Sequence, residues 1–134
     1  MTTKQKTVTG LTVLVLVFIL GFVPQYFEKR QMQRELAISI EKIKLSELRD
    51  LAGLMLLEAL RQNYGVAGDY SSQYFDKLRE TSEAVNNPTL KRSLQELLDK
   101  RATVTAALSK ADPASASQLQ AIFAETQAAT KAQP

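Results

Sequence analysis

The stretch Leu11-Thr-Val-Leu-Val-Leu-Val-Phe-Ile-Leu20 decides how the rest of the chain is organised. It is the middle of an uncharged run of 21 residues, from Thr7 to Phe27, between Lys6 and Glu28. A helix of this length covers roughly 30 Å, which matches the hydrocarbon core of a bilayer, and it satisfies its own backbone hydrogen bonds there. The sequence therefore predicts a transmembrane anchor at residues 7–27, preceded by a short basic tail at residues 1–6.

A cleaved signal peptide is the main alternative for this segment. It would have a shorter apolar core and a small-residue cleavage site. The only passable cleavage point follows Gly21, where Ile19 stands at the minus-three position and Pro24 lies just beyond. We therefore expect an uncleaved anchor, while cleavage after Gly21 would instead give a secreted soluble helical protein.

The charges that flank the run bear on its orientation. Lys4 and Lys6 form a short basic tail before a long apolar stretch, which is the layout of a signal anchor. Lys29, Arg30 and Arg34 on the other flank lean the opposite way, but large domains translocate largely regardless of charge. We expect a single-pass protein of the inner (plasma) membrane, with the bulk of the chain extracytoplasmic.

The composition excludes several classes of function. The formal net charge of the whole chain is only +3, and acidic and basic residues are interspersed beyond the anchor, whereas a nucleic-acid binder carries a basic face. The chain has no histidine and no cysteine, which removes histidine bases, thiol chemistry, zinc sites and the usual haem ligation. We expect no enzyme, no catalytic residues, no metal site and no cofactor.

The remainder of the chain predicts an all-α fold. The part of the chain beyond the anchor contains few helix-breaking glycines, namely Gly53, Gly65 and Gly68. We expect the transmembrane helix to continue as a helical stalk at residues 28–45 into an antiparallel bundle of three to four helices at residues 46–130, followed by a disordered tail at residues 131–134. Short connections between successive helices place neighbouring helices antiparallel.

The first helix beyond the membrane should reach about Asn63. Its segment from Leu51 to Leu60 is apolar almost all round, which is typical of a helix buried on several sides. Gly65 is expected to take the left-handed conformation that closes this helix, and Asp69 to cap a second helix from Tyr70 to Val85.

Two Asx-Pro pairs mark the later helices. Asn87-Pro88 and Asp112-Pro113 each place a capping side chain before a proline at the first helical position. Between them, five apolar residues fall at heptad spacing, with Arg101 in the one polar slot. They are Leu90, Leu94, Leu97, Val104 and Leu108. An ion pair between Glu96 and Lys100 is also expected from their spacing of four residues.

The predicted stalk carries an apolar row. Leu36, Ile40 and Ile43 lie at positions i, i+4 and i+7, a seam that should not face water alone. We expect this seam to pair with its own copy or with a partner's helix. The alternatives are that the helix bends and lays the seam on the membrane surface or under a longer third helix.

A tyrosine-rich segment forms the second candidate site. Arg61, Tyr64 and Tyr70 lie in the loop expected at the membrane-distal end of the bundle. Tyrosine and arginine are enriched at binding hot spots, so a ligand or partner could bind there. The simpler interpretation is that the tyrosines pack over a helix end and the core.

These patterns favour a membrane-anchored interaction, scaffold or accessory subunit of a larger envelope assembly, without chemistry of its own. Its layout also resembles the four-helix sensor modules of bacterial receptors, which implies a ligand-sensing ectodomain as the alternative. That resemblance concerns architecture alone and assigns no residues. The expected partners are the lipid bilayer and a protein, or a second copy of the chain through the stalk.

Overall fold

The computed structural model describes the backbone of residues 3–131 and the side chains of residues 10–18 and 29–131. All regular secondary structure within residues 3–131 is helical, without a strand, so the predicted all-α class is confirmed. This described range holds five helices: α1 (Thr3–Leu60), α2 (Tyr64–Ala84), α3 (Pro88–Leu98), α4 (Arg101–Ser109) and α5 (Ser115–Lys131).

The chain divides into two compact units, Met1–Ser39 and Ile40–Pro134, and α1 contributes to both. In the first unit, the side chains of residues 11–18 are exposed. Among the described residues, no helix has an apolar stretch long enough to cross a membrane. The anchor predicted at residues 7–27 and the tails predicted at residues 1–6 and 131–134 fall largely outside the described side chains.

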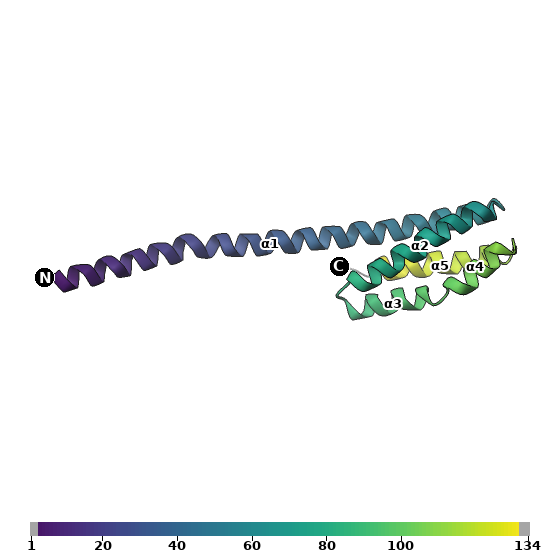
Figure 1. Ribbon diagram of the computed structural model, residues 1–134. Coiled ribbons are helices and arrows are strands. Elements are labelled where there is room, and N and C mark those ends of the chain that lie inside the picture. The colour runs from purple at the N-terminus through teal and green to yellow at the C-terminus, as the bar shows by residue number, and fades with distance from the viewer. Residues whose placement is uncertain (1–2, 132–134) are drawn as a thin grey trace. The chain divides into compact units, whose positions relative to one another are not determined.

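The second unit is a helical bundle, which confirms that prediction (Figure 1). Its part of α1 and the whole of α2 form an antiparallel hairpin, α3 and α4 follow one another along α2, and α5 returns beside them (Figure 1). The bundle therefore runs up, down, up and down. Its third leg consists of two helices, separated at Asp99 and Lys100, where the sequence predicted one.

The hydrophobic core lies among these four legs. One row of α1 is buried against it, and Tyr74 and Phe75 of α2 fill its centre with ring centroids 5.0 Å apart in an edge-to-face arrangement. The row of α1 consists of Leu45, Leu48, Ala52, Met55 and Ala59. All five heptad residues predicted between Leu90 and Leu108 are also buried, which confirms that pattern.

Among the described residues, one buried hydrogen bond between side chains crosses this core. The hydroxyl oxygens of Tyr74 and Thr126 are 2.7 Å apart, and Thr126 Oγ1 also donates to the carbonyl oxygen of Ile122 at 2.7 Å. Because a threonine hydroxyl has one proton, Tyr74 is the donor in the bond that joins α2 to α5. Burial raises the pKa of Tyr74 to about 12, so its hydroxyl remains protonated in neutral solution.

The turn between α1 and α2 differs from the prediction. The left-handed residue is Gln62, with φ of 62°, and Asn63 donates its backbone N–H to the carbonyl oxygen of Glu58 at 2.9 Å. This is the hydrogen-bond pattern of a Schellman cap, so α1 is already closed when Gly65 is reached. The predictions of Gly65 as the cap and of a second helix starting at Tyr70 are wrong, since α2 begins at Tyr64.

The later boundaries follow the predicted caps more closely. The Asn87 side chain accepts hydrogen bonds from the backbone of Thr89 and Leu90, as expected of a capping residue before Pro88. Asp112 Oδ1 accepts from the backbone N–H of Ala114 at 2.8 Å, just ahead of α5. The predicted pair of Glu96 and Lys100 is wrong.

Lys100 instead reaches a different helix. It lies between α3 and α4, where the chain turns out of the single helix that would have placed it one turn after Glu96. Its Nζ atom contacts Glu125 Oε1 of α5 at 2.6 Å.

The bond between Tyr74 and Thr126 predicts an asymmetric response to mutation. Thr126→Val leaves the buried Tyr74 hydroxyl without an acceptor and should lower the free energy of unfolding by about 1–3 kcal/mol. Tyr74→Phe leaves Thr126 bonded to Ile122 and should cost only about 0.5–1.5 kcal/mol. Denaturant unfolding of the two single variants and the double variant measures this, and a larger loss for Tyr74→Phe would contradict the assigned donor.

Candidate functional site

The most prominent unexplained surface of the second unit is the outer face of α1, which we define as Ile40, Ile43, Glu47, Asp50, Leu54 and Leu57. These residues are spaced alternately by three and four, as in the a and d positions of a coiled coil. At 100° per residue, the centre of this row is roughly 150° from the centre of the buried row. The two rows therefore lie on nearly opposite sides of one helix.

The apolar members of the outer face are open to solvent. The exposed fraction is 46% for Ile40, 58% for Ile43, 38% for Leu54 and 41% for Leu57. Scattered apolar residues are normal on a protein surface, but a row at coiled-coil spacing is a typical contact surface for another helix.

The outer face is bordered by a groove between α1 and α5. The groove has a volume of about 620 Å³, and Asp50, Leu54 and Leu57 belong to its α1 wall. Phe123 and Gln127 of α5 form the other wall, and Phe123 lies so close to Gly53 that a Cβ atom there would be 3.5 Å from its ring. Gly53 therefore marks where α1 and α5 approach, and Phe123 adds an aromatic edge to the surface.

The predicted seam corresponds to one end of this surface. Ile40 and Ile43 belong to the outer face, and Leu36 is an exposed residue of the first unit. The seam predicted from the sequence did not include Leu54 and Leu57. The segment from Leu51 to Leu60 was expected to be buried on several sides, and that prediction is wrong because Leu54, Leu57 and Leu60 are exposed.

The residues of the predicted tyrosine site make contacts that hold the turn and the core. Arg61 pairs with Glu58 at 3.0 Å, and Asn63 donates to the other oxygen of the same carboxylate at 3.0 Å. Tyr64 and Tyr70 are half-buried and pack against the core. Thus Glu58 holds the turn, while the three residues predicted as a ligand or partner site do not converge on a common cavity.

A shallow groove nevertheless lies beside this turn, between the start of α2 and the end of α4. It has a volume of about 460 Å³, and Tyr64, Gly68, Ser71 and Leu108 are among its lining residues. Ser71 Oγ is buried and has no hydrogen-bond partner within the described part of the chain. This groove is the best available place for a small ligand.

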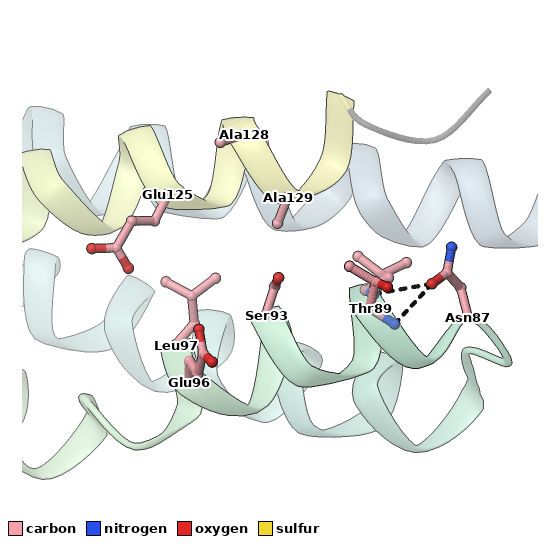
Figure 2. A pocket seen from close by; sticks show the side chains of 9 residues that line it. Asn87, Thr89, Ser93, Glu96, Leu97, Glu125, Ala128 and Ala129 are labelled. Atoms are coloured by element: carbon pink, nitrogen blue, oxygen red, sulfur yellow. Dashed lines mark hydrogen bonds between the residues drawn. The ribbon is translucent and has the colours of Figure 1, made fainter.

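A third concavity lies between α3 and α5 (Figure 2). Asn87 stands at one end, where its side chain is committed to capping α3, and Glu96 and Glu125 lie at the other (Figure 2). Glu125 is already paired with Lys100. Glu125 is therefore held in an ion pair between helices, while Glu96 is exposed.

Ion pairs cover the flank of α1 that faces α2. Lys44 contacts Glu80 at 3.0 Å, and Lys77 contacts Glu47 at 2.9 Å. The hydrogen bond to Glu47 is the main cause that raises the pKa of Lys77, and the hydrogen bond from Lys44 is the main cause that lowers the pKa of Glu80. These exposed pairs set the register of the hairpin more than its stability.

Two further observations concern the acidic groups and Arg101 in the described part of the chain. Among the described residues, no three acidic side chains come close enough together to hold a metal ion. Arg101, predicted in the polar heptad slot, pairs with Asp76 at 2.9 Å and lies 6.0 Å from the centroid of the Phe75 ring. It therefore covers the edge of the core.

Comparisons of the chain with protein-family models, with curated proteins and with solved structures found no match.

Because the two faces of α1 differ in burial, truncating two adjacent residues should change the free energy of unfolding by very different amounts. Met55→Ala should lower the free energy of unfolding of the isolated protein by about 2–5 kcal/mol, because it leaves a cavity in the core. Leu54→Ala should change it by less than about 1 kcal/mol, because Leu54 lies on the outer face. Denaturant unfolding measures both values, and equal losses would show that the two rows are not distinct.

Proposed function

We propose that the chain is a single-pass membrane-anchored subunit whose helical bundle binds another protein through the outer face of α1. It acts as a scaffold or accessory subunit and performs no reaction itself. The observation that carries this proposal is the exposure of Ile40, Ile43, Leu54 and Leu57 in one row, on the side of α1 nearly opposite the core. A helix that packs only within its own bundle needs one apolar row, so a second row of this spacing supports contact with another helix.

The membrane anchor is proposed on the sequence. The run from Thr7 to Phe27 carries no charge, and its described residues 11–18 are exposed and, apart from Thr12, apolar. So many exposed apolar side chains on one helix would be costly in water and favourable in lipid. The basic tail at Lys4 and Lys6 supports an orientation with the bundle on the extracytoplasmic side of the plasma membrane.

The composition supports a binding role over a catalytic one. Without histidine or cysteine, the chain must rely on carboxylates, lysines, tyrosines and hydroxyls for any chemistry. In the described residues many of these groups are committed to caps, ion pairs and the core bond between Tyr74 and Thr126. None of them is paired as a nucleophile with a base.

A ligand-sensing ectodomain is the second candidate, and one observation favours it. Ser71 Oγ is a buried, unpaired polar atom at the groove beside the α1–α2 turn. A small polar ligand could satisfy it. The partner-binding proposal is stronger because the outer face has four exposed apolar residues at coiled-coil spacing and because Tyr64 and Tyr70 are already used in packing.

The anchor can be tested by membrane extraction. The full-length chain should stay in the membrane pellet after washing with alkaline carbonate, because a spanning helix is held by the bilayer and not by surface charge. A shortened chain that starts at Glu28 lacks the apolar run and should be released into the supernatant with a helical circular-dichroism spectrum.

Release of the full-length chain by carbonate would contradict the anchor. Intact-mass measurement of the mature chain is the matched control for processing, because cleavage after Gly21 would remove the anchor and leave the secreted alternative.

A further inference from the structure

The outer face of α1 is not uniformly apolar. Ile40 and Ile43 form its first part and Leu54 and Leu57 its last, but Glu47 and Asp50 separate the two pairs at the same coiled-coil spacing. Any helix that covers the whole face must therefore pass over two carboxylates in succession.

The two acids differ in their partners. Glu47 contacts Lys77 of α2 at 2.9 Å, so its charge is already balanced within the bundle. Asp50 is exposed and has no ion pair in the part of the chain that the structure describes. Arg49, its neighbour, lies roughly 100° from Asp50 around the helix and so outside the row, and it lines the groove beside α5 together with Asp50 without forming an ion pair with it. Asp50 is thus the one charge of the outer face that a partner has to balance.

A second copy of the chain fits this face poorly. If two copies of α1 pair in parallel and in register, Asp50 meets Asp50 and Glu47 meets Glu47. If they pair antiparallel with Ile40 opposite Leu57, Asp50 meets Glu47. Both arrangements that overlap the full row place acid against acid, which is unfavourable where apolar side chains exclude water. An anionic bilayer surface would repel the same acids.

We infer that the occupant of the outer face is an amphipathic helix of another protein, with apolar residues at alternating spacings of three and four and a lysine or arginine opposite Asp50. This inference rests on the proposed function and specifies the chemistry of its partner. The apolar pairs at either end supply the contact area, and the basic residue supplies register and selects against self-association. The groove next to Asp50, with Phe123 on its far wall, gives a large partner side chain a place to insert.

A charge-swapped copy of the chain can serve as the probe for this partner. Asp50→Lys keeps the apolar row and supplies a lysine opposite the native Asp50 in a parallel pair. Full-length native chain, full-length Asp50→Lys chain and their equimolar mixture are compared in detergent micelles by sedimentation equilibrium. The mixture should form a heterodimer with a Kd at least about tenfold lower than that of the native chain alone, and about 0.5 M salt should reduce the difference.

Glu96→Lys is the matched control, because it makes the same change of charge on an exposed position of α3 away from the outer face. Its mixture with the native chain should be no tighter than the native chain alone, and thermal melts should show that both variants are folded. The inference is overturned if the Asp50→Lys mixture associates no more tightly than the native chain alone. Retention in the carbonate pellet would then still support the anchor, so the two claims can fail separately.

Discussion

The bundle depends on one constraint, which is that a single row of α1 has to be buried by the three other legs. Leu45, Leu48, Ala52 and Met55 lie against a core centred on Tyr74 and Phe75. Ala52 and Ala59 belong to the same buried row. Because this row uses one side of the helix, everything on the opposite side is available for another purpose.

The connections of the bundle follow from the same constraint. The hairpin of α1 and α2 closes through a left-handed Gln62, and Glu58 ties the turn to α1 through Arg61 and Asn63. The break at Asp99 lets α3 and α4 each lie against α2 and α5. Lys100 at this break reaches Glu125 and so links the third leg to the fourth.

Much of this architecture could be predicted from local signals. The heptad from Leu90 to Leu108 identifies a buried face by its period, and the Asn87-Pro88 pair identifies a cap because both residues act within one turn. The start of α2 and the break at Asp99 could not be predicted in this way. They depend on tertiary packing, which extends α2 back to Tyr64 through two glycines and interrupts a helix that lacks a strong breaker.

The residues of the candidate site could likewise be predicted only in part. Ile40 and Ile43 could be recognised because polar residues surround them, so their spacing is visible in the sequence. Leu54 and Leu57 lie in a segment that is apolar almost all round, where the inner and outer rows overlap and periodicity cannot separate them. Only the burial of Met55 and the exposure of its neighbours divide that segment into two faces.

The central claim is that α1 has one face for its own bundle and one for a partner. Its most direct test is thiol labelling, which is clean because the chain has no cysteine. The Leu54→Cys variant is labelled with a maleimide, both as the purified chain and in membranes of the cells that naturally produce it. The control is Arg92→Cys, which changes an exposed position of α3 and is labelled in the same two settings. The account predicts that Cys labelling at position 54 is rapid in the purified chain and strongly slowed in those membranes, while position 92 is labelled equally in both. Equal labelling of position 54 in both settings would show that nothing covers the outer face and would contradict the account.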